Sequence, residues 1–181
     1  MAYQGRRTAI PKCVVAVGVA RPGTENVKGR TRTFHGMSVE LPFAPVDTVI
    51  RREAGDLRVS ADAAEELARR IQRRGADLAR EAAEHATDAG RKTLMVDDFG
   101  FDATDTPTRG DLTLPVAPVD RIARLDIPDE YRVSADARVA LAAHLEAFAD
   151  DAAEGAATLA RHAGRRTVQA EDVETYFELV E

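Results

Sequence analysis

The sequence lacks the residues on which several classes of protein depend. It has one cysteine and no tryptophan, and aromatic residues make up 5% of the chain. A single thiol, that of Cys13, excludes an intramolecular disulfide framework and a cysteine-rich zinc site. No apolar run approaches the length of a membrane span, and no secretory signal with a small-residue cleavage site is recognisable. We therefore expect an intracellular, cytoplasmic protein that does not interact with membranes.

The signatures of common enzymes are missing as well. The four histidines are His35, His85, His144 and His162. They do not share the spacing of metal ligands, and the sequence contains neither a nucleophile elbow nor a glycine-rich phosphate loop. We expect no catalytic residue, no metal site and no cofactor.

Lysine is scarce, and charge of one sign dominates most of the chain. Only three of the 25 basic residues are lysines, and the net charge is -6. An excess of acid with few lysines is the surface expected of a protein that stays soluble in concentrated salt. We interpret the composition as halophilic.

Residues 1–36 differ from the rest in the sign of their charge. They hold seven basic side chains and one acid, so the remaining 145 residues carry a net charge of -12. Two interpretations stay open. The segment is either a disordered basic tail that could bind phosphates, or an extension upstream of a true start at Met37. We favour the start at Met37, because the organised sequence begins directly after it.

The sequence after Met37 is an internal repeat. Three motifs occur twice in the same order: residues 41–47 (LPFAPVD) and 114–120 (LPVAPVD), residues 58–63 and 132–137 (RVSADA), and residues 89–93 (AGRKT) and 163–167 (AGRRT). We assign residues 39–101 to a first repeat, 102–112 to a linker and 113–181 to a second repeat. Two copies are too few for a solenoid, which favours a pseudo-symmetric pair.

Prolines and glycines mark the helix ends in each repeat. Pro45 and Pro118 suit a first helical turn, so a short helix is expected to begin near each of them. Gly55 stops the first of these helices, and Gly90 and Gly164 close the longer helices that follow as C-cap residues. Each repeat is therefore predicted to be a short helix, a long helix and a short helix joined by loops, and the fold class is all-α.

The long helices are predicted over residues 61–88 and 135–162. Ser60 and Ser134 are good N-caps, and no proline interrupts either range. At ~1.5 Å per residue each helix spans roughly 40 Å.

An apolar stripe runs along one face of each long helix. Its residues are Leu67, Ile71, Leu78, Ala82 and Ala86 in the first repeat, and Leu141, Leu145, Phe148, Ala152 and Leu159 in the second. Such a helix cannot bury its stripe alone, so the other repeat must supply the partner helix. Gly75 lies mid-helix and either permits a close crossing or is a tolerated defect that costs ~1 kcal/mol.

On these motifs, each repeat resembles an archaeal histone over essentially its full length. The closing segments at residues 96–98 and 170–172 add to the resemblance. The tandem layout looks like the doublet histones of haloarchaea. The resemblance implies two histone folds that interlock head to tail in an intramolecular handshake, a pseudo-dimer. Residues 1–36 lie outside it.

The resemblance also implies double-stranded DNA as a partner. The implied DNA-binding residues are Arg58 and Arg132 in the minor groove, Thr167 and Thr93 steadying them from the opposite repeat, Lys92 and Arg166 at phosphates, and Arg121, Arg51 and Arg124 at a central site. Arginine suits a narrow minor groove, and loop amides suit phosphates. None of these contacts reads base edges, so binding is expected to be nearly independent of sequence.

Other residues are implied to be structural or to join molecules. Arg91 with Asp98, and Arg165 with Asp172, are expected to form ion pairs. The family stacks dimers through a histidine and an aspartate, which the second repeat keeps as His162 and Asp172, with Leu159 beside them. Asp88 replaces the histidine in the first repeat, whose last helix is cut short around residues 99–101. We therefore expect self-association through the second repeat only.

Three functions are compatible with this sequence. The first is an architectural, nucleoid-associated chromatin protein that bends or wraps DNA. The second is a histone-fold transcription regulator or protein-recruiting module that pairs with other histone-fold proteins and hardly compacts DNA, which the charge of -12 favours. The third is an interaction scaffold with vestigial loops, and the retained Arg and Thr positions argue against it.

Overall fold

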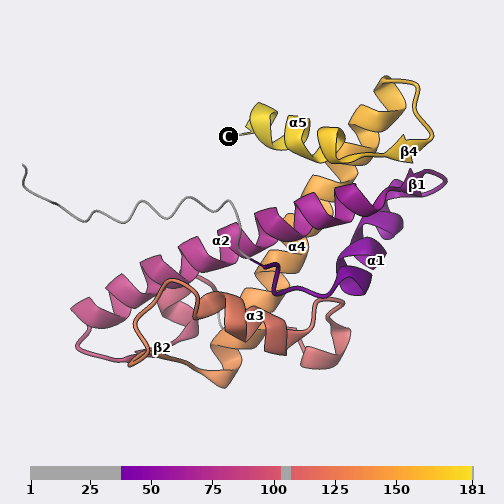
Figure 1. The fold of residues 1–181 in the computed structure, drawn as a ribbon. Coiled ribbons are helices and arrows are strands. Elements are labelled where there is room, and N and C mark those ends of the chain that lie inside the picture. Colours follow the sequence, from indigo (N-terminus) through magenta and orange to yellow (C-terminus); the bar gives the residue numbers. More distant parts are fainter. Residues whose placement is uncertain (1–37, 103–106, 181) are drawn as a thin grey trace, which may run out of the picture. The chain divides into compact units, whose positions relative to one another are not determined.

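A computed structural model describes residues 38–102 and 107–180, which belong to one compact unit (Figure 1). The basic segment 1–36 lies outside the described residues, so both interpretations of it stay untested. None of the described helices combines the length and the apolar content of a membrane-spanning segment.

The first repeat contains two α-helices and ends in a single turn of 3-10 helix. Its elements are α1 (Phe43–Ala54), β1 (Arg58–Val59), α2 (Ala61–Asp88), β2 (Thr93–Leu94) and η1 (Val96–Phe99).

The second repeat contains three α-helices. Its elements are α3 (Val116–Ala123), β3 (Arg132–Val133), α4 (Ala135–His162), β4 (Thr167–Val168) and α5 (Ala170–Val180), and a 3-10 turn, η3 (Arg109–Asp111), precedes them in the linker.

The long helices begin and end where local chemistry dictates. The hydroxyl of Ser60 accepts a hydrogen bond from the amide of Ala63 over 3.2 Å, and Ser134 caps α4 in the same way. The chain leaves both helices through a glycine with φ +68°, which a residue with a side chain rarely adopts. These glycines, Gly90 and Gly164, lie one residue beyond the C-caps, whereas the sequence had suggested the caps themselves.

The two repeats share one hydrophobic core instead of building one each. α1 packs on α4 and α5 packs on α2, so short helices of each repeat cover the long helix of the other. Figure 1 shows the two long helices crossing. Apolar residues of both long helices that are fully buried include Leu67, Ile71, Leu141 and Leu145. The predicted intramolecular handshake is confirmed.

Gly75 is the point of close approach between the repeats. A Cβ atom added there would lie 2.8 Å from Ile122 and 3.0 Å from Leu145, both in the second repeat. Since the distance to Ile122 is shorter than real Cβ contacts, a larger residue here would force its neighbours to shift, and the glycine permits the close crossing. The alternative, a tolerated helix defect, is therefore set aside.

The ends of the two repeats are not equivalent. In the second repeat α5 lays Phe177 against Phe148, with ring centroids 5.4 Å apart, and Arg70 lies over the Phe177 ring. In the first repeat the helix stops after four residues at Gly100, whose φ of +73° turns the chain. Phe101 then stacks on His144 at 4.6 Å. An aromatic side chain carried by a loop thus covers a surface that a helix covers in the other repeat.

Candidate nucleic-acid interface

Short parallel strands join the loops of the two repeats in pairs. β1 pairs with β4, and β2 pairs with β3. Each pair brings the loop before one long helix beside the loop after the other long helix. The unit therefore has two loop pairs related by its pseudo-symmetry, which we call the β1/β4 site and the β2/β3 site.

The β1/β4 site joins Arg58 to the loop that follows α4. The amide of Arg58 donates to the carbonyl of Arg166 over 2.9 Å, and the strand register sets Arg58 opposite Thr167. Arg58 and Arg166 are exposed. Arg161 lies at the same end and donates to the carbonyl of Ala54 over 2.9 Å.

The β2/β3 site repeats this geometry with different side chains. The amide of Arg132 donates to the carbonyl of Lys92 over 2.9 Å, and Arg132 lies opposite Thr93. Here the Lys92 ammonium is bound to Glu130 at 2.8 Å, and this hydrogen bond raises the pKa of Lys92. The candidate minor-groove arginines and their threonines are thus brought together at both sites.

Two internal ion pairs hold the loops that follow the long helices. Arg91 binds both oxygens of Asp98 at 2.8 and 2.9 Å, and Asp98 also accepts from the amide of Met95. Burial raises the pKa of Asp98, but these hydrogen bonds outweigh burial and hold the pKa below its ordinary value. Arg165 and Asp172 form the corresponding pair in the second repeat. Both pairs fix the shape of a loop that carries candidate DNA contacts.

The three arginines of the candidate central site are each bound to an acid. Arg121 binds Glu40 at 2.8 Å, across the repeats. Arg51 binds Asp47 at 2.6 Å and Arg124 binds Asp120 at 3.2 Å, each one helical turn away. The three arginine side chains are exposed, and exposed ion pairs of this kind are weak.

The candidate self-association residues lie at the end of α4 and the start of α5. His162 is exposed and Leu159 is half-buried. Asp172 is 1% exposed and accepts from Arg165 and from the amide of Gln169. Within a single molecule, Asp172 is therefore occupied in holding its own loop.

The basic residues of α2 are interlaced with acids. Arg69 binds Glu65 and Glu66, and Arg80 binds Asp77. The face is a solvated one laced with ion pairs, as the sequence favoured, and not a continuous basic stripe.

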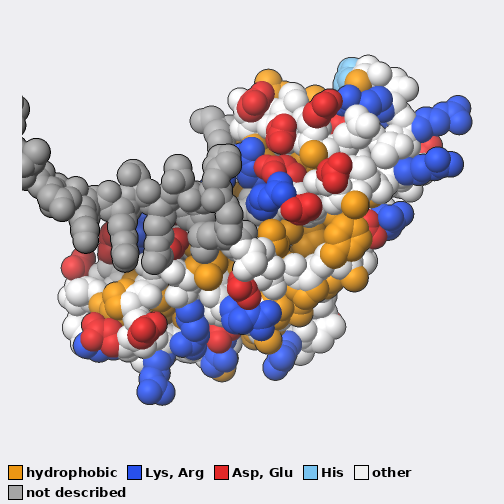
Figure 2. Space-filling model, viewed as in Figure 1, with side chains coloured by type: hydrophobic (Ala, Val, Ile, Leu, Met, Phe, Trp, Pro, Cys, Tyr) orange, Lys and Arg blue, Asp and Glu red, His pale blue; other side chains and the backbone are white. Residues whose placement is uncertain are grey.

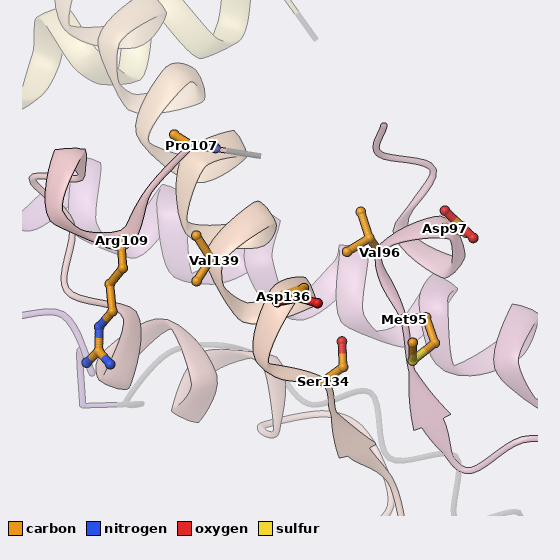
Figure 3. Close-up of a pocket in the computed structure, with 8 residues that line it drawn as sticks. All are labelled: Met95, Val96, Asp97, Pro107, Arg109, Ser134, Asp136 and Val139. Atoms are coloured by element: carbon orange, nitrogen blue, oxygen red, sulfur yellow. The ribbon is translucent and has the colours of Figure 1, made fainter. Parts of the chain in front are cut away.

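An open pocket of about 510 Å³ flanks the β2/β3 site (Figure 3). One wall is formed by Met95, Val96 and Asp97, and the other by Ser134, Asp136 and Val139, with Pro107 and Arg109 from the linker. Two carboxylates and the guanidinium of Arg109 therefore lie beside this site. Among the described residues, no group of three or more His, Cys, Asp or Glu side chains could hold a metal ion.

The sequence prediction missed three charged residues at these sites. Glu130, Glu40 and Arg161 were not assigned to them, although each binds a neighbour there. One signal was present for Glu130: the loop before α4 holds three acids between residues 124 and 131, whereas the loop before α2 holds only Asp56.

The helix order, the shared core and the paired loops define the class of the protein, a pair of histone folds in one polypeptide. A model of the family "Histone-like transcription factor (CBF/NF-Y) and archaeal histone" matches the chain twice, at residues 39–100 and 112–175. The chain belongs to this family of histone-like transcription factors and archaeal histones. It is accordingly a DNA-binding chromatin protein that assembles with histone-fold subunits, and not an enzyme.

Individual relatives agree with this assignment. The archaeal histone HAN1 of Thermococcus zilligii is 52% identical over 60 residues, which are 33% of this chain and 87% of that protein. The crystal structure of the histone from Methanopyrus kandleri aligns with a TM-score of 0.60 at 27% identity, covering 75% of this chain and 92% of that one. A protein of Thermus thermophilus aligns with the same TM-score at 20% identity, over 78% of this chain and 97% of its own, which shows likeness of fold alone.

Proposed function

We propose that this protein binds double-stranded DNA independently of sequence and bends or wraps it as a chromosome-associated protein of the cytoplasm. The observation that carries the proposal is the pair of loop sites, each with an arginine, an opposing threonine and a basic neighbour. The protein bends DNA in this proposal because one duplex must follow both sites and the central arginines between them.

The physical roles follow from the geometry. Arg58 and Arg132 are exposed and have no acidic partner among the described residues, so their guanidinium groups are available for the minor groove. Lys92, Arg166, Arg121, Arg51 and Arg124 neutralise phosphates. Because phosphates repeat along every duplex, such contacts position DNA without selecting a sequence.

We further propose the domain boundaries of the sequence analysis, with residues 39–101 and 113–181 as the two histone folds. In this proposal molecules associate with each other through the second fold, at His162, Leu159 and the loop that Asp172 holds. Other histone-fold proteins are candidate partners at the same surface.

A second candidate function is a transcription regulator or recruiting module that hardly compacts DNA. The specific observation that favours it is the number of candidate DNA contacts bound to acids. Lys92 and all three central arginines have a carboxylate partner in the described structure. Each candidate contact that stays bound to an acid is one phosphate contact fewer for DNA, and the contacts that remain weaken as salt rises.

Binding to a random-sequence duplex, measured across salt up to molar potassium chloride, tests the proposal. We expect sequence-independent binding that strengthens as salt falls. The double variant Arg58→Ala/Arg132→Ala should weaken binding by at least tenfold at low salt, since two arginines in the groove are lost.

A variant with the same charge change serves as the control. Arg69→Ala/Arg80→Ala removes two arginines from the solvated face of α2 and should leave the affinity within about twofold. Equal losses in the two variants, or no binding at any salt, would favour the recruiting module.

A further inference from the structure

We propose that the two loop sites bind DNA unequally: the β1/β4 site holds the duplex, while Glu130 competes with phosphate for Lys92 and makes the β2/β3 site the end that releases first. The inference rests on the proposed function, since it describes how much each of the two loop sites contributes to the affinity for DNA.

The competing contact is an ion pair between the repeats. Lys92 comes from the loop after α2 and Glu130 from the loop before α4, with the ammonium and carboxylate 2.8 Å apart. Both side chains are exposed, at 65% and 56%. An exposed pair of this kind breaks easily, but its carboxylate stays beside the place where a phosphate would bind. A phosphate at Lys92 therefore meets a negative charge that it must displace.

Among the described residues, no acid binds the basic side chains of the β1/β4 site. Arg166, which takes the place of Lys92 there, has no acidic partner in the part of the chain that the structure describes, and neither has Arg58. The residue corresponding to Glu130 is Asp56, for which no partner is found among the described residues. Arginine also binds phosphate with two parallel hydrogen bonds, whereas lysine acts as a point charge.

Neighbouring charges differ in the same direction. Arg161 adds a positive charge to the β1/β4 end, while its counterpart, Thr87, is neutral and bonds to the hydroxyl of Tyr131 at 2.5 Å. The carboxylates Asp97 and Asp136 beside the β2/β3 site do not add to this difference, because the first turns at the β1/β4 site hold acids, Glu171 and Asp62, at the corresponding positions.

Figure 2 shows basic side chains projecting at the end where Figure 1 places β1 and β4 and also at the end where it places β2, with acidic side chains near both groups. The two ends therefore differ in which acids bind the basic side chains, and both expose basic residues.

The loop before the long helix is longer and more acidic in the second repeat. α3 has eight residues and α1 has 12, so the second repeat has a longer loop before its long helix. That loop holds Asp126, Asp129 and Glu130, whereas the shorter loop of the first repeat holds only Asp56. The second repeat therefore carries more acidic residues in this loop, and Glu130 is the one that binds Lys92.

Single substitutions at matched positions give the first test, with binding to a short random-sequence duplex measured over a range of salt. Arg166→Ala should lower the affinity for DNA about tenfold at low salt. It should also reduce the slope of the logarithm of affinity against the logarithm of salt concentration by about the value of one phosphate contact. Lys92→Ala should lower the affinity about threefold. Glu130→Gln should raise affinity about threefold, and most of that gain should vanish in the Lys92→Ala background.

Asp56→Asn is the matched control for Glu130→Gln. Its small electrostatic gain should be the same with and without Arg166→Ala, because Asp56 does not hold that arginine. Thermal unfolding of every variant shows that the fold is intact. Equal losses from Arg166→Ala and Lys92→Ala, or a gain from Glu130→Gln that is independent of Lys92, would overturn the inference while leaving the proposed function standing.

A positional readout separates the two ends directly. Ala89→Cys and Ala163→Cys place a photocrosslinker at exposed, corresponding C-caps beside the two sites, in a chain with Cys13→Ser. As salt rises, crosslinks to DNA from position 89 should fade before those from position 163. Loss of both crosslinks at the same salt concentration would contradict unequal binding at the two sites. The absence of crosslinks and of binding at all salt concentrations would overturn both this inference and the proposed function.

Discussion

At Gly75 a single missing methyl group decides how closely the long helices cross. Gly75→Ala would improve helix propensity by ~1 kcal/mol. It would also press a Cβ atom against the side chains of Ile122 and Leu145, which would have to shift within a packed core. We expect a net loss of about 1–3 kcal/mol in the free energy of unfolding, measured by urea denaturation.

Gly110→Ala is the control for this prediction. A Cβ atom at Gly110 would meet nothing within 4 Å, and the residue does not require a positive φ. Its substitution should leave the unfolding midpoint almost unchanged. A Gly75→Ala protein as stable as the wild type would mean that the crossing relaxes, and the tight packing inferred at this residue would be wrong.

At the scale of elements, Glu146 fastens two segments to α4. Its carboxylate accepts from the amides of Thr113 and Leu114 at 2.7 and 3.0 Å and lies 3.5 Å from the guanidinium of Arg52 in α1. Burial raises the pKa of Glu146, but these hydrogen bonds and Arg52 outweigh burial and hold the pKa below its ordinary value of 4.5. The corresponding residue in the first repeat is Gln72, which binds the segment before α1.

The depressed pKa gives a prediction for stability against pH. A carboxyl group whose pKa is lower in the folded state contributes stability above 4.5, and that contribution is lost as pH falls through the folded value. Glu146→Gln should cost about 1–2 kcal/mol at pH 7. The variant should also lose less stability than the wild type on acidification below pH 4.5.

Thermal melts from pH 7 to 3 measure both effects. Glu81→Gln, an exposed change on α2, should melt like the wild type throughout. Parallel pH curves for Glu146→Gln and the wild type would show that another acid carries this part of the acid sensitivity.

The elements also show which features the sequence could predict. The long helices were predicted with their observed bounds, because a serine cap, an uninterrupted range and a glycine are local signals. The handshake followed from an apolar stripe too long to bury alone. The stacking of Phe101 on His144 could not be predicted from the sequence, because it depends on where a loop without periodicity turns back.

The candidate site was predicted unevenly for a related reason. The resemblance that the repeated motifs carry singled out Arg58 and Arg132 with Thr167 and Thr93, and the strand register sets these residues opposite each other. The acids that bind Lys92 and Arg121 are not repeated between the two halves of the chain. Contacts that break the pseudo-symmetry leave no trace in a comparison of one repeat with the other.

At the scale of the whole molecule, the unequal ends predict limited assembly on DNA. The second repeat has an exposed His162 beside a half-buried Leu159. The first repeat has Asp88 and His85 at these positions, and His85 is bonded to the carbonyl of Asp98 at 2.7 Å. We expect two molecules to join through their second repeats and assembly to stop there, measured by sedimentation with DNA fragments of increasing length.

A substitution at each end distinguishes the surfaces. His162→Ala should abolish the pairing step, whereas Asp88→Ala should leave it unchanged. Complexes that keep growing with the length of the DNA would refute a single association surface.

The shared core has a consequence for synthesis on the ribosome. Arg161 reaches Ala54 across 107 residues, and β1 finds its partner only in β4, near the end of the chain. While the nascent chain holds only its first half, α2 can pack against α1 and η1, but its partners in the second repeat, α3, α4 and α5, are absent. Part of the apolar surface of α2 therefore stays exposed to solvent until the second repeat has been synthesised. During this interval, two chains translated next to each other on one messenger RNA can exchange their repeats. We therefore expect domain-swapped dimers to form on polysomes.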